Sequence, residues 1–100
     1  IDNWLRHVQD VAARHREPLA RAPAGEPRYD RLCELNVIEQ VVNVARTTIV
    51  QGAWSRAQPV TLHGFVYGLK DGLLRDLGIE AASMAGLERD YAAAVGRYLP

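Results

Sequence analysis

The side chains of this sequence that could hold a soft metal ion are one cysteine and three histidines, namely Cys33, His7, His15 and His63. Zinc sites use thiolate and imidazole ligands, which commonly recur at short spacings such as C-x-x-C or H-x-x-H. No histidine lies near Cys33 in the sequence, and neither spacing occurs. We therefore assign no catalytic, cofactor-binding or metal-binding residue, and keep a site built from Cys33 and a histidine as a minor hypothesis.

Each of these side chains also has a structural interpretation. Cys33 lies at the edge of an apolar helical arc, where a free cysteine behaves as a small hydrophobic residue, so we expect it to be packed. His15 continues an apolar stripe and is expected to be a packing histidine whose polar atoms are satisfied. His63 falls in a predicted strand and could hydrogen-bond across the sheet.

Two further sequence patterns lack the residues that a catalytic or phosphate-binding site would need. A polar stripe follows one helix, at Asn36, Glu39, Gln40 and Asn43. No nucleophile or paired base accompanies this stripe, so we expect it to face solvent or another subunit. Glycines at positions 64, 68 and 72 do not match the spacing of phosphate-binding loops. They indicate turns and close approaches of the backbone.

The composition limits the chain to one domain at most. It has 100 residues, with 12 basic and 12 acidic side chains and a pI near 7.0. This balance gives no overall attraction to nucleic acid or to a membrane surface, and no apolar run is long enough to span a bilayer. A single cysteine forms no disulfide within the chain, which is typical of the cytoplasm, where we place the protein.

Hydrophobic periodicity of about 3.6 residues predicts four helices, which cover the first 15 residues and residues 28–46, 48–58 and 83–98. Asp2 or Asn3 is the expected N-cap of the first helix, and Thr48-x-x-Gln51 has the form of a capping box for the third. Residues 17–27 contain three prolines and are predicted to be a loop.

Residues 60–69 are rich in β-branched and aromatic side chains and predict a strand. A turn at residues 70–72 and a second strand at residues 73–77 complete a hairpin. Apolar residues occupy both faces of the first strand, with Val60, Leu62 and Val66 on one and Phe65, Tyr67 and Leu69 on the other. Such a strand is typical of a sheet covered by helices on both sides.

A two-stranded hairpin is marginal by itself, and several amphipathic helices here need a sheet to cover. We therefore expect further strands that precede residue 1. The chain does not begin with methionine, and its only methionine is Met84, which agrees with a portion of a longer protein. The predicted fold class is α/β, as the C-terminal part of a mostly parallel sheet flanked by helices. We expect that part to end in an antiparallel edge strand and a C-terminal helix.

Three stretches carry a family resemblance: LCELNVIEQV at residues 32–41, TIVQGAW at 48–54 and HGFVYGLKDGLLRDL at 63–77. In sequence and order they closely resemble bacterial β-class carbonic anhydrases. The start, IDNWL, is similar to the helix that follows the zinc-site loop in that family. The resemblance extends over nearly the whole chain, which would be the C-terminal portion of a single carbonic anhydrase domain, at residues 1–100.

The resemblance implies a zinc lyase that interconverts carbon dioxide and bicarbonate and assembles as a dimer or tetramer. In the family, two cysteines and a histidine from C-x-D-S-R and H-x-x-C motifs hold the zinc. Neither motif occurs here, and Cys33 matches a helix cysteine of the family that is not a ligand. Both motifs would lie before residue 1, so we expect this chain alone to bind no zinc and to be inactive.

On this interpretation the segment is a scaffold and a subunit interface of the enzyme, and its partner is the remainder of its own domain. The alternative is a stand-alone, non-catalytic interaction or oligomerisation domain derived from the same fold. That alternative predicts a cooperatively folded chain without zinc.

Overall fold

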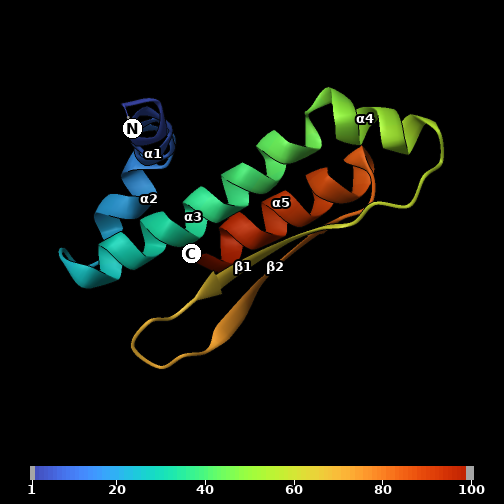
Figure 1. Cartoon of the computed structure of the whole chain (residues 1–100). Coiled ribbons are helices and arrows are strands. Elements are labelled where there is room, and N and C mark those ends of the chain that lie inside the picture. The colour runs from blue at the N-terminus through green and yellow to red at the C-terminus, as the bar shows by residue number, and fades with distance from the viewer. Residues whose placement is uncertain (1, 99–100) are drawn as a thin grey trace.

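A computed structural model describes the backbone of residues 2–98 and the side chains of residues 5–25 and 27–97. Along the chain it contains α1 (Asp2–Arg14), α2 (Arg16–Arg21), α3 (Glu26–Ala45), α4 (Thr48–Ser55), β1 (Leu62–Tyr67), β2 (Leu74–Ala81) and α5 (Met84–Tyr98). Helices α3 and α5 lie side by side in opposite directions, with the hairpin against them and with α1 and α2 beside the first half of α3 (Figure 1). This mixture of helices and strands confirms the α/β class.

The predicted loop at residues 17–27 is wrong in its first half, because residues 16–21 form α2. Pro18 lies in the first turn of α2, and Pro27 lies in the first turn of α3. The N–H groups of a first turn have no partner within the helix, so a proline there costs no hydrogen bond. These prolines therefore mark helix starts, and the connection shrinks to residues 22–25.

Two predicted caps have different outcomes. Thr47, one residue before the predicted cap, is the N-cap of α4, and its hydroxyl accepts a hydrogen bond from the Val50 N–H at 3.3 Å. The Gln51 amide donates to the Ala45 carbonyl at 2.7 Å, so the capping box predicted from Thr48 does not form. Capping by Asp2 or Asn3 concerns side chains outside the described residues.

The sheet has two strands, and β1 pairs with β2 in antiparallel fashion. The second strand is longer than the predicted 73–77 and ends at Ala81. The pairing register shifts between His63 and Phe65. These residues lie two positions apart on β1, whereas their partners Glu80 and Asp76 lie four positions apart on β2. Parallel neighbours of β1 remain a prediction, because the described strands include none.

The main core lies where α3, α5 and the inner face of the hairpin meet. It contains nine buried residues: Ile38, Val41, Val42, Ala45, Leu77, Ile79, Ala81, Leu87 and Ala94. Gly64 allows this contact, because a Cβ there would lie 2.8 Å from Ile79 Cγ2 and 3.3 Å from Val37 Cγ1. A smaller cluster of Val11, Leu19 and Leu35 joins α1 and α2 to α3. Hydrophobic burial therefore concentrates on one side of the hairpin.

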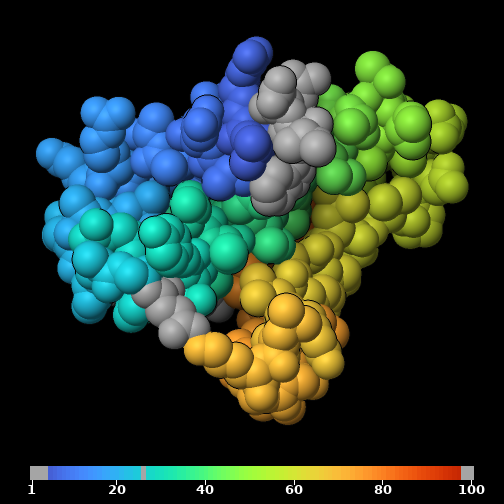
Figure 2. All heavy atoms as spheres, turned by 60° about the vertical axis from the view of Figure 1, so that its left-hand side comes forward, coloured from blue at the N-terminus to red at the C-terminus, as the bar shows by residue number. Residues whose placement is uncertain are grey.

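The other face of the hairpin is open, so the expectation that both faces of β1 are buried is wrong for this chain. Phe65 is 44% exposed and Tyr67 is 58% exposed. The hairpin tip stands out from the body of the molecule (Figure 2), and Leu69 at this tip is 91% exposed. Among the described helices, none is both long and apolar enough to cross a lipid bilayer.

Candidate functional site

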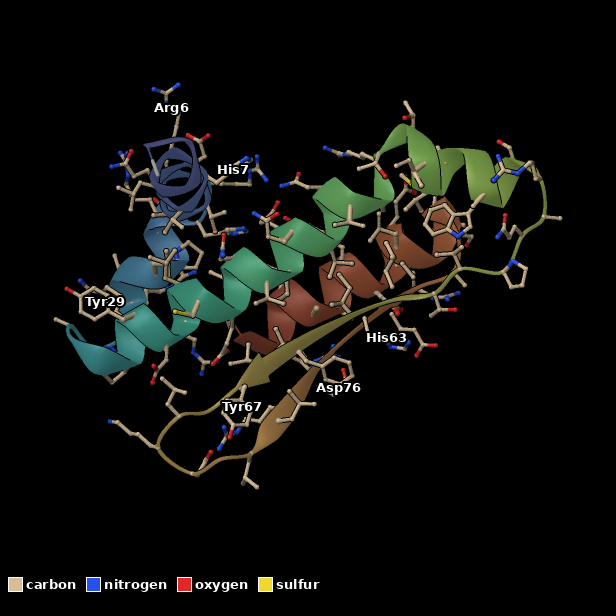
Figure 3. The ribbon with its side chains drawn as sticks, in the orientation of Figure 1. Arg6, His7, Tyr29, His63, Tyr67 and Asp76 are labelled. Carbon is tan, nitrogen blue, oxygen red and sulfur yellow. The ribbon has the colours of Figure 1, made fainter. Side chains whose placement is uncertain are left out.

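The residues that could ligate a soft metal lie apart in the fold. His7 is exposed on α1 (Figure 3), His15 is buried between α1 and α2, and Cys33 and His63 are exposed on α3 and β1. Among the described residues, no group of three His, Cys, Asp or Glu side chains is placed to hold a metal ion. A zinc ion held by two cysteines and a histidine therefore does not fit the residues present.

Cys33 is exposed, so the expectation that it packs in the core is wrong for this chain. The buried face of α3 runs through Leu35, Ile38 and Val42. At about 100° per residue, Cys33 lies roughly 200° around the helix from Leu35, away from the cluster that Leu35 forms with Val11 and Leu19.

The polar stripe of α3 does not form one surface. Asn43 is exposed, but Glu39 is only 4% exposed, so the prediction of a solvent or subunit face is wrong for Glu39. Its Oε1 accepts a hydrogen bond from Arg14 Nη1, and its Oε2 accepts one from the Tyr91 hydroxyl. His15 Nε2 lies 3.3 Å from Glu39 Oε2. We call Arg14, His15, Glu39 and Tyr91 the Glu39 node.

This node explains how a carboxylate is tolerated in the interior. A buried charge costs several kcal/mol unless a counter-charge and hydrogen bonds compensate for it, and here Arg14 supplies the charge. His15 is 8% exposed and satisfied by Glu39, which confirms its predicted packing role. Burial, reinforced by the hydrogen bond and charge of Glu39, raises the pKa of Tyr91 to about 12. The Tyr91 phenol therefore keeps its proton and continues to donate a hydrogen bond to Glu39.

A pocket of about 250 Å³ opens beside the node between α3 and α5. Its charged lining consists of Arg14 and Arg46 against Glu39 and Glu88, over an apolar floor that includes Leu87. The two charges of each sign balance, and the Glu39 oxygens are already occupied. The pocket therefore selects neither an anion nor a cation, and it contains no activated nucleophile.

The outer face of the hairpin carries the other group of polar and aromatic side chains. The rings of His63 and Phe65 stack with their centroids 5.9 Å apart. Glu80 is the cross-strand partner of His63, and Asp76 is that of Phe65. His63, Tyr67 and Asp76 lie along the hairpin on the side away from α3 and α5 (Figure 3). This face combines apolar area with carboxylates but lacks a converging set of catalytic groups.

The hairpin turn agrees with the prediction at residues 70–72. Asp71 Oδ1 accepts the Leu73 N–H at 3.0 Å, and Asp71 Oδ2 accepts a hydrogen bond from Arg75 Nη2. The Arg75 hydrogen bond, followed by that of the Leu73 backbone, lowers the pKa of Asp71. Gly72 supplies the positive φ of 68° that the turn requires. These contacts give the turn a structural role.

Two buried polar atoms on α3, Arg28 Nε and Asn36 Oδ1, have no hydrogen-bond partner among the described residues. Asn36 Oδ1 is buried, and none of the described residues donates a hydrogen bond to it. A buried carbonyl oxygen without a donor costs about 1–3 kcal/mol. Sequence analysis placed Asn36 in a polar stripe but gave no sign of this deficit.

Comparisons with known proteins define the class. The model of the carbonic anhydrase family matches residues 1–74. A carbonic anhydrase of Emericella nidulans is 37% identical over 92 residues, which cover 91% of this chain and 40% of that protein. The chain belongs to the carbonic anhydrase family.

A solved structure narrows the class further. The β-carbonic anhydrase of Coccomyxa, in complex with acetazolamide, superposes with a TM-score of 0.80 at 32% identity. The match covers 89% of this chain and 41% of the algal chain. The chain is therefore a segment of β-class type, and it spans about two fifths of the length of the relatives that it matches.

Proposed function

We propose that this chain is the C-terminal portion of a zinc-dependent β-carbonic anhydrase, a lyase that interconverts carbon dioxide and bicarbonate. Within that enzyme the segment serves as a scaffold and as part of a subunit interface. Its family membership and its coverage of only 40% of the fungal relative support this assignment. The zinc ligands would come from C-x-D-S-R and H-x-x-C motifs outside these residues, since the donors present do not form a zinc site.

The observation that carries the proposal is the unequal burial of the two hairpin faces. Ile79 on the inner face is fully buried, whereas Phe65 on the outer face is 44% exposed. Among the described strands, β1 also has a neighbour on one edge only. Additional parallel strands beside β1, with helices over the outer face, would bury these aromatic side chains. The unpaired Asn36 Oδ1 agrees with a scaffold that lacks some of its partners.

Other properties of the parent enzyme follow from the family and are part of the proposal. We place the enzyme in the cytoplasm as a homodimer or tetramer. Exposed apolar residues of the hairpin tip, such as Leu69 and Leu74, are available for contacts with the rest of the domain or with another subunit.

A chimera tests the scaffold role. This chain replaces the matching segment of the Emericella nidulans enzyme, and carbon dioxide hydration is followed by stopped flow alongside the isolated chain. We expect zinc-dependent hydration from the chimera and none from the isolated chain. A Gly64→Phe chimera is the control, because its ring would displace Ile79 and break the scaffold. A zinc-dependent rate from the isolated chain, or a folded chimera that holds zinc without activity, would contradict the proposal.

The alternative function is a stand-alone interaction domain. Its support is the main core of nine buried residues, which the chain closes by itself. Cooperative unfolding of a chain that stays monomeric and binds no other part of the enzyme favours this alternative. A chain that becomes fully ordered only in the chimera favours the scaffold.

A further inference from the structure

Helices α1 and α2 form an arm, residues 2–21, that rests on one side of α3 (Figure 1). Val11 and Leu19 are its buried apolar anchors, and they pack around Leu35. The main core beside it contains nine buried residues from α3, α5 and β2. Among the described side chains, the buried apolar cluster that attaches the arm is therefore much smaller than the one that holds the core together.

The free energy that closes the arm is correspondingly small. Among the side chains that the structure describes, only Val11 and Leu19 of the arm are fully buried in an apolar cluster, so their hydrophobic contribution is modest. Ordering the backbone of the arm costs conformational entropy, which the hydrogen bonds within α1 and α2 offset only in part. Segments with few buried contacts open at a lower free energy than the whole protein. The polar contacts of the arm therefore decide whether it stays closed.

Those polar contacts meet at one carboxylate. Arg14 is the last residue of α1 and His15 is the junction residue before α2, so both side chains lie at the corner of the arm. Both reach Glu39 on α3, and Tyr91 reaches the same carboxylate from α5. Glu39 thus ties the corner of the arm to two helices of the core.

The charge of Glu39, and not only its shape, makes this arrangement possible. An ionised carboxylate presents acceptor oxygens alone, which suits the hydrogen bonds donated by Arg14 and by the Tyr91 hydroxyl. A glutamine has nearly the same shape but carries no charge. The ion pair with Arg14 would then be lost. Arg46 and Glu88, which line the same pocket, are of opposite charge and supply no substitute.

We propose that the Glu39 carboxylate is a latch. Its contacts with Arg14, His15 and Tyr91 hold the arm closed on α3, and without its charge the arm opens as a unit while the main core stays folded. Opening exposes the apolar side chains of Val11 and Leu35, so the latch controls access to a surface that is buried in the closed state.

Native-state hydrogen exchange on the full chain tests the latch by comparing Glu39→Gln with the wild type. We expect protection of the α1 and α2 amides to fall by about tenfold or more, and protection in the second half of α3, in β2 and in α5 to change by less than about threefold. Glu34→Gln is the matched control. It neutralises a carboxylate of the same helix that bonds only to Arg31 at 3.4 Å among the hydrogen bonds described, and the arm should keep its protection.

Three results would overturn the proposal: an equal loss of protection in arm and core, no loss in the arm, or the same loss in Glu34→Gln. If Glu39→Gln does not fold, Arg14→Gln decides the matter. That variant keeps the Glu39 carboxylate and removes the charged contact of the arm, so protection of the α1 and α2 amides should fall by about threefold or more while protection in the main core changes less. An equal loss in arm and core, or no loss in the arm, would show that the node is a general stabilising contact and not a latch.

Discussion

The two faces of the hairpin differ more than any other pair of surfaces in this molecule. The inner face carries Leu77 and Ile79, which are 2% and 0% exposed, and it closes the main core with α3 and α5. The outer face carries Phe65 and Tyr67, which stay about half exposed. One face of the hairpin is thus buried in the core, and the other face is uncovered. The difference is what we expect if, as proposed, this segment is one layer of a larger sheet structure.

The largest expected effect is at the completed face. Ile79→Ala removes a fully buried side chain and leaves a cavity between α3 and α5, so it should lower the free energy of unfolding by about 2–5 kcal/mol. Urea denaturation followed by circular dichroism measures this change. A loss below about 1 kcal/mol would show that the inner face is not tightly packed.

A smaller effect is expected where the strand meets the helix. Gly64→Ala places a Cβ 2.8 Å from Ile79 Cγ2 and should cost about 1–3 kcal/mol in the same denaturation experiment. Gly96→Ala on α5 is the control, because nothing lies within 4 Å of its new Cβ. Alanine is the better helix former, so this control should stabilise the chain by roughly 0.5–1 kcal/mol. If Gly64→Ala and Gly96→Ala changed the free energy of unfolding equally, the close contact between Gly64 and Ile79 would be refuted.

The Glu39 node predicts a loss of stability at alkaline pH. The pKa of Tyr91 is about 12 in the folded protein, above the ordinary value of 10.0. The folded state therefore holds this proton more tightly, and the resulting stability is complete below about pH 10 and is lost as the pH rises toward 12. Discounted for solvent screening of a half-buried phenol, the loss is on the order of 1 kcal/mol.

Urea denaturation at about pH 9 and about pH 11.5 measures this loss, and Tyr91→Phe should reduce it. The two proteins share every other ionisable group, so the difference between them isolates Tyr91. If Tyr91→Phe lost the same stability between these two pH values as the wild type, a group other than Tyr91 would be responsible.

The smallest change in stability is expected at the uncovered face. Phe65→Thr puts a β-branched residue with high strand propensity in place of an aromatic ring that is 44% exposed, so the free energy of unfolding should change by less than about 1 kcal/mol. Self-association of the isolated chain, measured by sedimentation velocity, should decrease because less apolar surface is exposed. A destabilisation as large as that of Ile79→Ala would mean that the two faces are equivalent.

Long periodic segments could be predicted from the sequence. Helices α3 and α5 lie close to the predicted 28–46 and 83–98, because their apolar residues recur at helical spacing. The hairpin and its turn followed from the strand pattern and from the Asp71-Gly72 pair. Helix α2 was missed because Pro18 was interpreted as a breaker, although the first turn of a helix accepts proline.

The Glu39 node could not be predicted, because pairing between residues distant in the sequence leaves no local pattern. An analysis of hydrophobic periodicity counts Glu39 as a polar residue on the solvent side of the helix. Its burial depends on Arg14 and Tyr91, which lie 25 and 52 residues away in the sequence. A glutamate next to Ile38 and close to Val41 on a core helix was the available signal. The exposure of Cys33 and Phe65 was missed for a different reason, since apolar periodicity marks the side chains suited to burial but does not say which of them this chain covers.

Amide exchange along β1 tests the central claim most directly, by comparing the isolated chain with the Emericella nidulans chimera. In the isolated chain only one edge of β1 is paired, so alternate amides between Leu62 and Tyr67 should be protected while the others exchange freely. In the chimera, strands added on the free edge should protect both sets. Free-edge amides that stay unprotected in a folded chimera would contradict the account of this chain as one layer of a larger sheet.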